Sequence, residues 1–86
     1  MRHKFENILD EELCYLAIET RDGLNLTQKE MGELLQMGEI FYSNLETGDT
    51  ICASAPTPTL LLRMQEDPSV FLNRVAERFD EALQPI

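Results

Sequence analysis

Hydrophobic residues recur every three or four positions along most of this chain, which is the spacing of one face of an α-helix. A first helix is predicted to begin near Asp10, which can cap it, and to end at Asp22-Gly23. No stretch alternates apolar and polar residues convincingly, so strands are poorly supported. The apolar stripe of this first helix consists of Leu9, Leu13, Leu16 and Ala17.

The second helix has the clearest start in the chain. Thr27 can cap it, and Glu30 can reach back to the Thr27 amide, which makes a capping box. The helix is expected to stop near Gln36, before a tight turn at Met37-Gly38. Its predicted buried face consists of Met31, Leu34 and Leu35.

A third helix is predicted from Glu39 to about Thr47, and Gly48 closes it. The spacing of Phe41 and Leu45 predicts that both pack inward, whereas Tyr42 is expected to straddle the surface. The remaining polar side of this helix carries Ser43, Asn44 and Thr47.

The next segment begins as a loop over residues 49–58, with Ile51 as its expected contact with the core. Thr57-Pro58 then reads as a cap followed by proline in the first helical turn. A fourth helix is therefore predicted over roughly residues 60–66.

Asp67-Pro68 separates this helix from an amphipathic C-terminal helix over about residues 69–83. Residues 1–86 are thus predicted to form one all-α domain of five helices. The apolar stripe of the last helix can pack back on the first and fourth helices, or it can pair with itself across a two-fold axis. We favour the homodimer, through Phe71, Val75, Phe79 and Leu83.

The composition is strongly acidic, with sixteen acidic residues, seven basic residues and a net charge of −9. This acidity counts against strong non-specific binding to nucleic acid, because neutralising phosphates supplies much of that affinity. From Gly23 to Arg63, both included, the only basic residues are Lys29 and Arg63. A usable face can still exist, because a small domain can separate its charges between two sides.

Two cysteines, Cys14 and Cys52, and the single histidine, His3, form no cluster, so no metal site is expected. The two thiols could form a disulfide, but a helical chain without a signal peptide favours a reducing cytoplasm and two small core residues. No apolar run approaches the ~20 residues that span a bilayer. No nucleophile has a positioned base, and there is no glycine-rich phosphate loop. We expect a cytoplasmic protein without catalytic residues, cofactor or membrane partner.

The stretch LTQKEMGELLQMGEIFYSNLETG, residues 26–48, resembles the helix-turn-helix of Xre/Cro-type regulators without a gap from Thr27 to Gly48. The following APTPTLLLRMQEDPSVF resembles the end of MqsA-type antitoxin domains. The resemblance implies a helix-turn-helix over about residues 27–47 that binds double-stranded DNA. The implied function is a repressor that occupies a palindromic operator as a dimer, in the role of the antitoxin of a toxin–antitoxin pair.

The resemblance also implies which residues meet DNA. Asn44 could bond adenine, Glu39 could accept from cytosine N4, and Ile40 could touch a thymine methyl group. Arg2, Lys4 and Arg21 are further candidates for phosphate contacts. The implied DNA-binding set is Thr27, Gln28, Lys29, Glu39, Ile40, Ser43 and Asn44.

The sequence departs from the family pattern at three positions. Gly32 replaces the usual alanine, which still allows close helix approach but lowers helix propensity by roughly 1 kcal/mol. The turn glycine is absent at Gln36 and present at Gly38, so the turn is expected to have a different shape. The third departure is Asn44, which stands where many relatives carry arginine.

The partner of Glu46 stays open at this stage: its side chain either faces solvent or pairs with Arg63.

A second interpretation belongs to another class of protein. The same scaffold could be an acidic interaction module that binds a basic partner, such as a toxin, or that imitates DNA to occupy a nucleic-acid-binding protein. The small number of basic residues from Gly23 to Arg63 favours this alternative.

Overall fold

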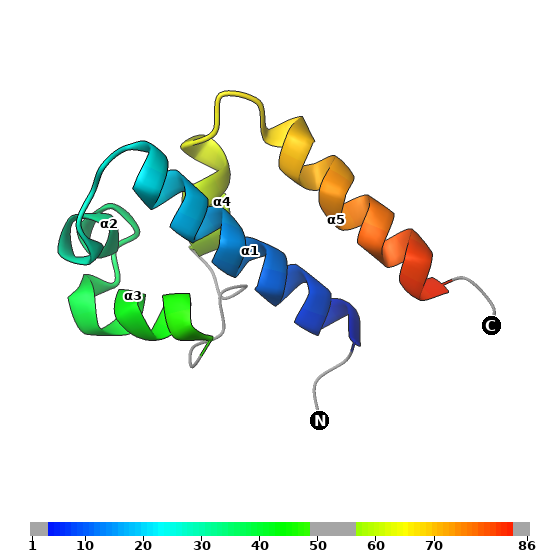
Figure 1. Cartoon of the computed structure of the whole chain (residues 1–86), viewed down its shortest axis with the longest axis horizontal. Helices are drawn as coiled ribbons and strands as arrows, with labels where there is room; N and C mark the ends of the chain where they lie inside the picture. Colours follow the sequence, from blue (N-terminus) through cyan, green and yellow to red (C-terminus); the bar gives the residue numbers. More distant parts are fainter. Residues whose placement is uncertain (1–3, 49–56, 84–86) are drawn as a thin grey trace.

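The computed structural model describes residues 4–48 and 57–83, and the regular structure within these ranges is entirely helical. Figure 1 shows α2 and α3 at one end of α1, while α5 runs alongside α1. Helix α1 packs against α3, α4 and α5, and α2 packs against α3. No helix in the described ranges is long and apolar enough to cross a membrane. The elements are α1 (Lys4–Gly23), α2 (Gln28–Leu34), α3 (Gly38–Thr47), α4 (Thr57–Arg63) and α5 (Pro68–Leu83).

The all-α prediction is confirmed, and the predicted start of the first helix is wrong. Helix α1 begins at Lys4 rather than near Asp10, because no glycine or proline interrupts the residues before Asp10. It ends at Gly23, as predicted. Asn25 adopts the left-handed conformation with φ 56°, and the Leu26 amide bonds the Arg21 carbonyl at 3.0 Å.

The turn between α2 and α3 has the geometry of a Schellman motif. The Met37 amide donates to the Gly32 carbonyl at 2.9 Å, and the Gln36 amide donates to the Glu33 carbonyl at 3.1 Å. Gln36 has φ 60°, so it occupies the left-handed position that glycine usually takes. The left-handed conformation is therefore made without a glycine at this position.

Helix α3 faces α1 in a register different from the predicted one. Tyr42 is fully buried, and its hydroxyl donates to the Ala17 carbonyl at 3.3 Å, whereas Phe41 is 64% exposed. The predicted pair of Phe41 and Leu45 is wrong because α3 turns Tyr42 and Leu45, three residues apart, towards α1. The phenol can enter the core because its polar tip finds an acceptor.

The core otherwise follows the predicted stripes. Leu34 is the exception: it is half exposed, because α2 ends at Leu34 and Met37 packs against the core after the turn. Ile51 and Cys52 lie outside the described residues. The buried apolar residues are Leu13, Leu16, Ala17, Met31, Leu35, Tyr42, Leu45, Leu61, Phe71 and Val75.

Helix α5 uses most of its predicted dimerisation residues within the chain. Phe71 and Val75 are buried in the core, and Phe79 packs against it. These side chains follow the alternative in which the stripe packs back on α1. Leu83 is the one member of the predicted set that is exposed.

Charged side chains also join α5 to α1. Arg74 Nε lies 3.0 Å from Glu12 Oε2, and Arg78 Nη1 lies 3.1 Å from Glu11 Oε2. Glu12 is buried, and its second oxygen lies 3.5 Å from Arg78 Nη1, so two guanidinium groups compensate its charge. Two of the seven basic residues are therefore committed to this helix pair.

Replacing Gly32 with alanine is expected to destabilise the fold, although alanine is the better helix former. A Cβ atom on Gly32 would lie 2.5 Å from the Gly38 carbonyl oxygen, which is backbone and cannot swing aside. We expect a net loss of about 1–2 kcal/mol in the free energy of unfolding. Gly23→Ala is the matched control, because nothing lies within 4 Å of a Cβ there, and it is expected to stabilise. Urea denaturation of both variants checks this, and stabilisation by Gly32→Ala would contradict the close approach.

Replacing Gln36 with glycine is expected to stabilise the protein. Gln36 is exposed and left-handed, and a non-glycine residue costs roughly 1–2 kcal/mol in that conformation. After the entropy that glycine adds to the unfolded chain, the net gain should be about 0.5–1 kcal/mol. Thermal unfolding followed by circular dichroism measures it. An unchanged or lower midpoint would show that the turn does not have this conformation in solution.

Candidate functional site

The N-terminal turn of α2 and the outer side of α3 line a shallow groove of about 280 Å³. Five of the seven residues predicted to bind DNA meet there. Thr27 and Lys29 flank Gln28 in the chain and are exposed without lining the groove. The lining residues are Gln28, Glu39, Ile40, Ser43 and Asn44.

The capping box fixes the start of α2 beside this groove, as predicted. Thr27 Oγ1 accepts a hydrogen bond from the Glu30 amide at 3.1 Å, and Glu30 Oε1 accepts one from the Thr27 amide at 2.9 Å. The hydrogen bonds from the Thr27 backbone and side chain lower the pKa of Glu30. The amides of Thr27 and Glu30 are therefore bonded within the capping box. The amides of Gln28 and Lys29 take no part in it.

Glu46 is the polar centre of the site. Arg21 Nε donates to Glu46 Oε2 at 2.5 Å, and Arg21 Nη2 donates to Glu46 Oε1 at 3.2 Å. Gln28 Nε2 donates to the same Oε1 at 3.0 Å, and Arg21 Nη1 donates to the Leu26 carbonyl at 3.2 Å. The side chains of Glu46 and Arg21 are only 10% and 21% exposed. One carboxylate thus ties together α1, α2 and α3.

This arrangement changes two predicted roles. Glu46 pairs with Arg21, not with Arg63 or with solvent. Arg21 is consequently engaged inside the domain, so its assignment as a phosphate contact is not supported by its position. No local sequence pattern indicates this pair, because its members are separated by 25 residues and lie on different helices. Arg2 lies outside the described residues.

The pKa values of this cluster follow from burial and hydrogen bonding. Burial acts to raise the pKa of Glu46, but the hydrogen bonds from Arg21 and Gln28 outweigh it, so the pKa lies below its usual value. The hydrogen bond to Glu46 raises the pKa of Arg21. Burial raises the pKa of Tyr42 well above its usual range. At neutral pH the cluster is therefore an ionised pair beside a neutral phenol.

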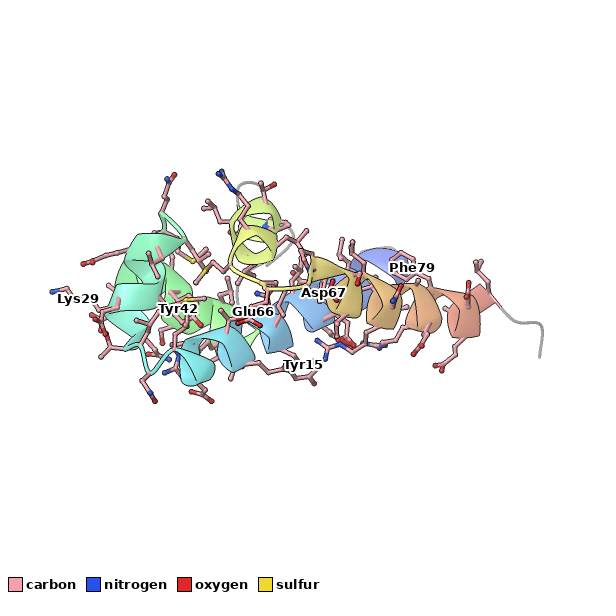
Figure 2. All side chains as sticks on the ribbon, turned by 90° about the horizontal axis from the view of Figure 1, so that it is seen from above. Tyr15, Lys29, Tyr42, Glu66, Asp67 and Phe79 are labelled. Atoms are coloured by element: carbon pink, nitrogen blue, oxygen red, sulfur yellow. The ribbon has the colours of Figure 1, made fainter. Side chains whose placement is uncertain are left out.

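The groove itself carries little charge. Glu39 is its single carboxylate, and the other lining residues are neutral. Because Gln28 donates its amide group to Glu46, its Oε1 is left as the acceptor for a ligand. Lys29 supplies the one positive charge between Asp22 and Leu62 in the described part of the chain, and Figure 2 shows it at the α2 end. The described lining of the groove thus carries one carboxylate, whereas α2 presents two further exposed carboxylates, Glu30 and Glu33, outside it.

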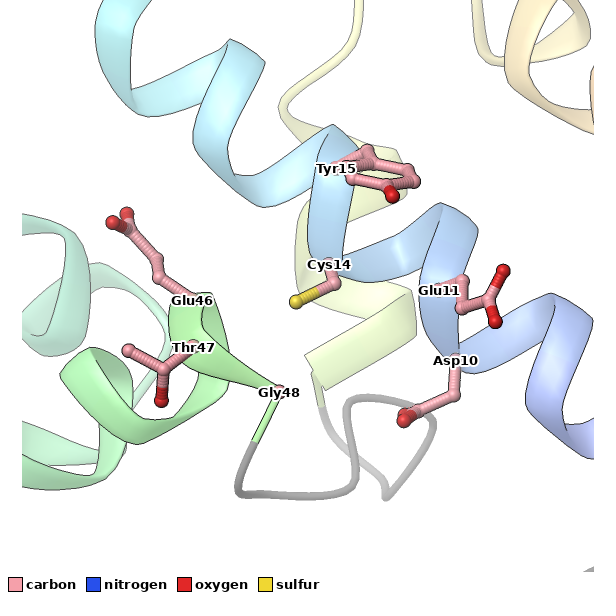
Figure 3. A pocket seen from close by; sticks show the side chains of 7 residues that line it. All are labelled: Asp10, Glu11, Cys14, Tyr15, Glu46, Thr47 and Gly48. Carbon is pink, nitrogen blue, oxygen red and sulfur yellow. The ribbon is translucent and has the colours of Figure 1, made fainter.

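A second hollow of about 360 Å³ lies between α1 and the C-terminal end of α3 (Figure 3). The thiol of Cys14 donates to the Leu45 carbonyl at 2.6 Å, so it joins the two helices. The Glu46 carboxylate points away from this thiol in Figure 3, towards its partner Arg21. None of the described residues that line this hollow is a histidine, lysine or arginine. The described residues also contain no group of three or more side chains suited to hold a metal ion.

Replacing Glu46 with glutamine is expected to lower the free energy of unfolding at neutral pH by about 2 kcal/mol, because hydrogen bonds to a charged partner are lost. The lowered pKa of Glu46 has a second consequence. Its stabilisation is present above the unfolded-state pKa, near ~4.3, and is lost as the pH falls through the lower folded-state pKa.

Urea denaturation between neutral and acidic pH measures both effects. The difference between wild type and Glu46→Gln should shrink as the pH falls. Glu33→Gln, which changes an exposed carboxylate on α2, should leave the stability nearly unchanged. A difference that stays constant with pH would count against an ionised Glu46.

No protein-family model, no curated protein and no solved structure matches the chain. The similarity of residues 26–48 to Xre/Cro-type regulators therefore stays a prediction from the sequence. The geometry of α2 and α3 is the basis on which a function can be proposed.

Proposed function

We propose that this chain is a sequence-specific DNA-binding regulator that represses transcription by occupying an operator. The observation that carries the proposal is the shared groove of Gln28, Glu39, Ile40, Ser43 and Asn44. Helix α2 and the closely packed α3 are joined by a tight turn, which supports taking the pair as a helix-turn-helix. In this motif the second helix enters the major groove of DNA.

The groove residues suit base edges more than phosphates. Asn44 can bond adenine N6 and N7, Ile40 can contact a thymine methyl group, and Glu39 can accept from cytosine N4. Ser43 can donate or accept, and the Gln28 Oε1 accepts. We therefore expect an operator whose contacted positions are adenine, thymine and cytosine, since no side chain here offers the paired donors that guanine requires.

The position of Ile40 strengthens this proposal. Its side chain is 76% exposed, which is a large exposure for a branched apolar residue on a helix. The thymine methyl group is an apolar partner that the major groove of DNA offers to such a side chain. Gly32, which lets α2 approach α3 closely, keeps this side of α3 beside Gln28.

The test is a fluorescence-anisotropy titration with duplexes that cover the DNA flanking the gene. We expect one duplex to bind, with an affinity that falls as salt rises. Asn44→Ala should weaken that duplex by about 1–3 kcal/mol, or roughly 5- to 150-fold, because one base contact is lost. Asn73→Ala, which removes an exposed asparagine on α5, is the matched control and should leave the affinity unchanged.

Replacing Lys29 with alanine completes the experiment. It should weaken all duplexes equally and lower the salt slope by about one, as the loss of one phosphate contact does. If no flanking duplex binds even at low salt, or if the two asparagine variants behave alike, the regulator proposal fails.

A second candidate function is an acidic module that binds a basic protein. It is favoured by Phe41, which is exposed beside Ile40 and close in the chain to Glu39. An exposed aromatic ring can stack on the guanidinium of an arginine, and an exposed carboxylate can pair with another arginine. Phe41→Ala distinguishes the two candidates: it should weaken binding of an arginine-rich amphipathic peptide, and it should leave the affinity for the operator duplex unchanged, since Phe41 does not line the groove.

A further inference from the structure

Glu39 and Ile40 stand side by side in the first turn of α3, and both line the groove between α2 and α3. In a helix-turn-helix the first residues of the second helix are the ones that contact base edges. The Cα atoms of consecutive residues are only ~3.8 Å apart, so this pair offers neighbouring contacts to the DNA. One contact is a hydrogen-bond acceptor and the other is apolar.

The fold itself makes little use of these two side chains. Ile40 is the most exposed of the large apolar residues in the described part of the chain, at 76%. Glu39 is exposed as well, and its carboxylate pairs with none of the basic side chains that the structure describes. Glu46, in contrast, is held by Arg21. The acceptor of Glu39 and the apolar surface of Ile40 are therefore both open to a ligand.

Among base edges in the major groove, few place a hydrogen-bond donor beside an apolar group. Cytosine donates from N4, but its neighbouring C5 carries only a hydrogen atom. Thymine has a methyl group at C5, but its O4 is an acceptor and repels a carboxylate. Adenine donates from N6 beside the acceptor N7. A cytosine that is methylated at C5 presents the N4 donor and a methyl group on neighbouring ring atoms, and so it matches both side chains.

We propose that Glu39 and Ile40 together bind 5-methylcytosine, so that the groove prefers a methylated operator to an unmethylated one. Glu39 accepts a hydrogen bond from N4, and Ile40 covers the methyl group, which takes the place of the thymine methyl group considered above. The inference rests on the proposed function, because it requires α3 to lie in the major groove. Occupancy of the operator then increases when this cytosine is methylated.

The size of the expected preference follows from the burial of one methyl group. Burial of a CH₂ group contributes ~0.8 kcal/mol, which corresponds to about fourfold in affinity. Replacing 5-methylcytosine with thymine keeps the methyl group but removes the N4 donor. That change should weaken binding by more than about tenfold, because the Glu39 carboxylate then faces an acceptor without a hydrogen bond.

The probe is the flanking duplex that binds in the titration described above. Each of its cytosines is replaced in turn with 5-methylcytosine, and separately with thymine paired to adenine. At one position we expect 5-methylcytosine to bind about fourfold more tightly than cytosine, and thymine at that position to bind more than about tenfold more weakly than 5-methylcytosine. Fluorescence anisotropy at one fixed salt concentration measures both ratios.

Two variants separate the two contacts. Ile40→Ala should reduce the preference for 5-methylcytosine over cytosine to less than about twofold, while it keeps the preference for cytosine over thymine. Glu39→Gln should keep the preference for the methyl group but lose most of the discrimination against thymine, because an amide can donate to O4 as well as accept from N4. Phe41→Ala is the matched control: Phe41 is exposed but does not line the groove, so both ratios should stay at the wild-type value.

The possible results distinguish this inference from the function on which it rests. If the operator binds but methylation tightens binding at none of its cytosines, the inference is wrong while the regulator function stands. The same holds if Ile40→Ala keeps the full preference for 5-methylcytosine. If no duplex binds in either methylation state, both proposals fail. Circular dichroism of the three variants should match the wild type, since all three positions are exposed.

Discussion

The arrangement of α2 and α3 depends on one buried carboxylate. Glu46 accepts from Arg21 on α1 and from Gln28 on α2 while it belongs to α3 itself. A hydrophobic core alone would allow these short helices to slide, since α2 has only seven residues. A charged pair with little exposure has few favourable geometries, because each unmet hydrogen bond leaves a charge poorly solvated. The hydrogen bonds of Glu46 therefore help to set the shape of the groove between α2 and α3.

The register of α3 follows from the same cluster. Tyr42 lies one turn before Glu46, and its hydroxyl reaches the Ala17 carbonyl on α1. With Tyr42 buried, helical geometry turns Phe41 outwards beside Ile40. An aromatic ring is thus exposed at the end of the molecule that carries the groove. Phe41 is thus exposed because Tyr42, and not Phe41, is the aromatic residue that α3 places in the core.

Local signals in the sequence were sufficient for the helices and insufficient for the contacts between them. The capping box at Thr27 and Glu30, the closing Gly48 and the apolar stripe of α1 are short-range features, and the structure has them as predicted. The choice between Phe41 and Tyr42 was different, because three- and four-residue spacings to Leu45 are equally helical. Arg21 and Glu46 meet only after the chain has folded. Five of the seven candidate site residues still converged, because they lie on two helices that a short turn holds together.

The distribution of charge bears on the difficulty that an acidic chain poses for DNA binding. Arg21, Arg74 and Arg78 are occupied by carboxylates of the same chain, so they neutralise Glu46, Glu12 and Glu11 within the fold. The exposed carboxylate that lines the groove is Glu39. Net charge governs long-range attraction and non-specific affinity, whereas discrimination between bases depends on the side chains at the groove. Under the proposed function, an acidic domain whose groove is lined by one carboxylate would therefore bind DNA weakly in general while still distinguishing one sequence from another.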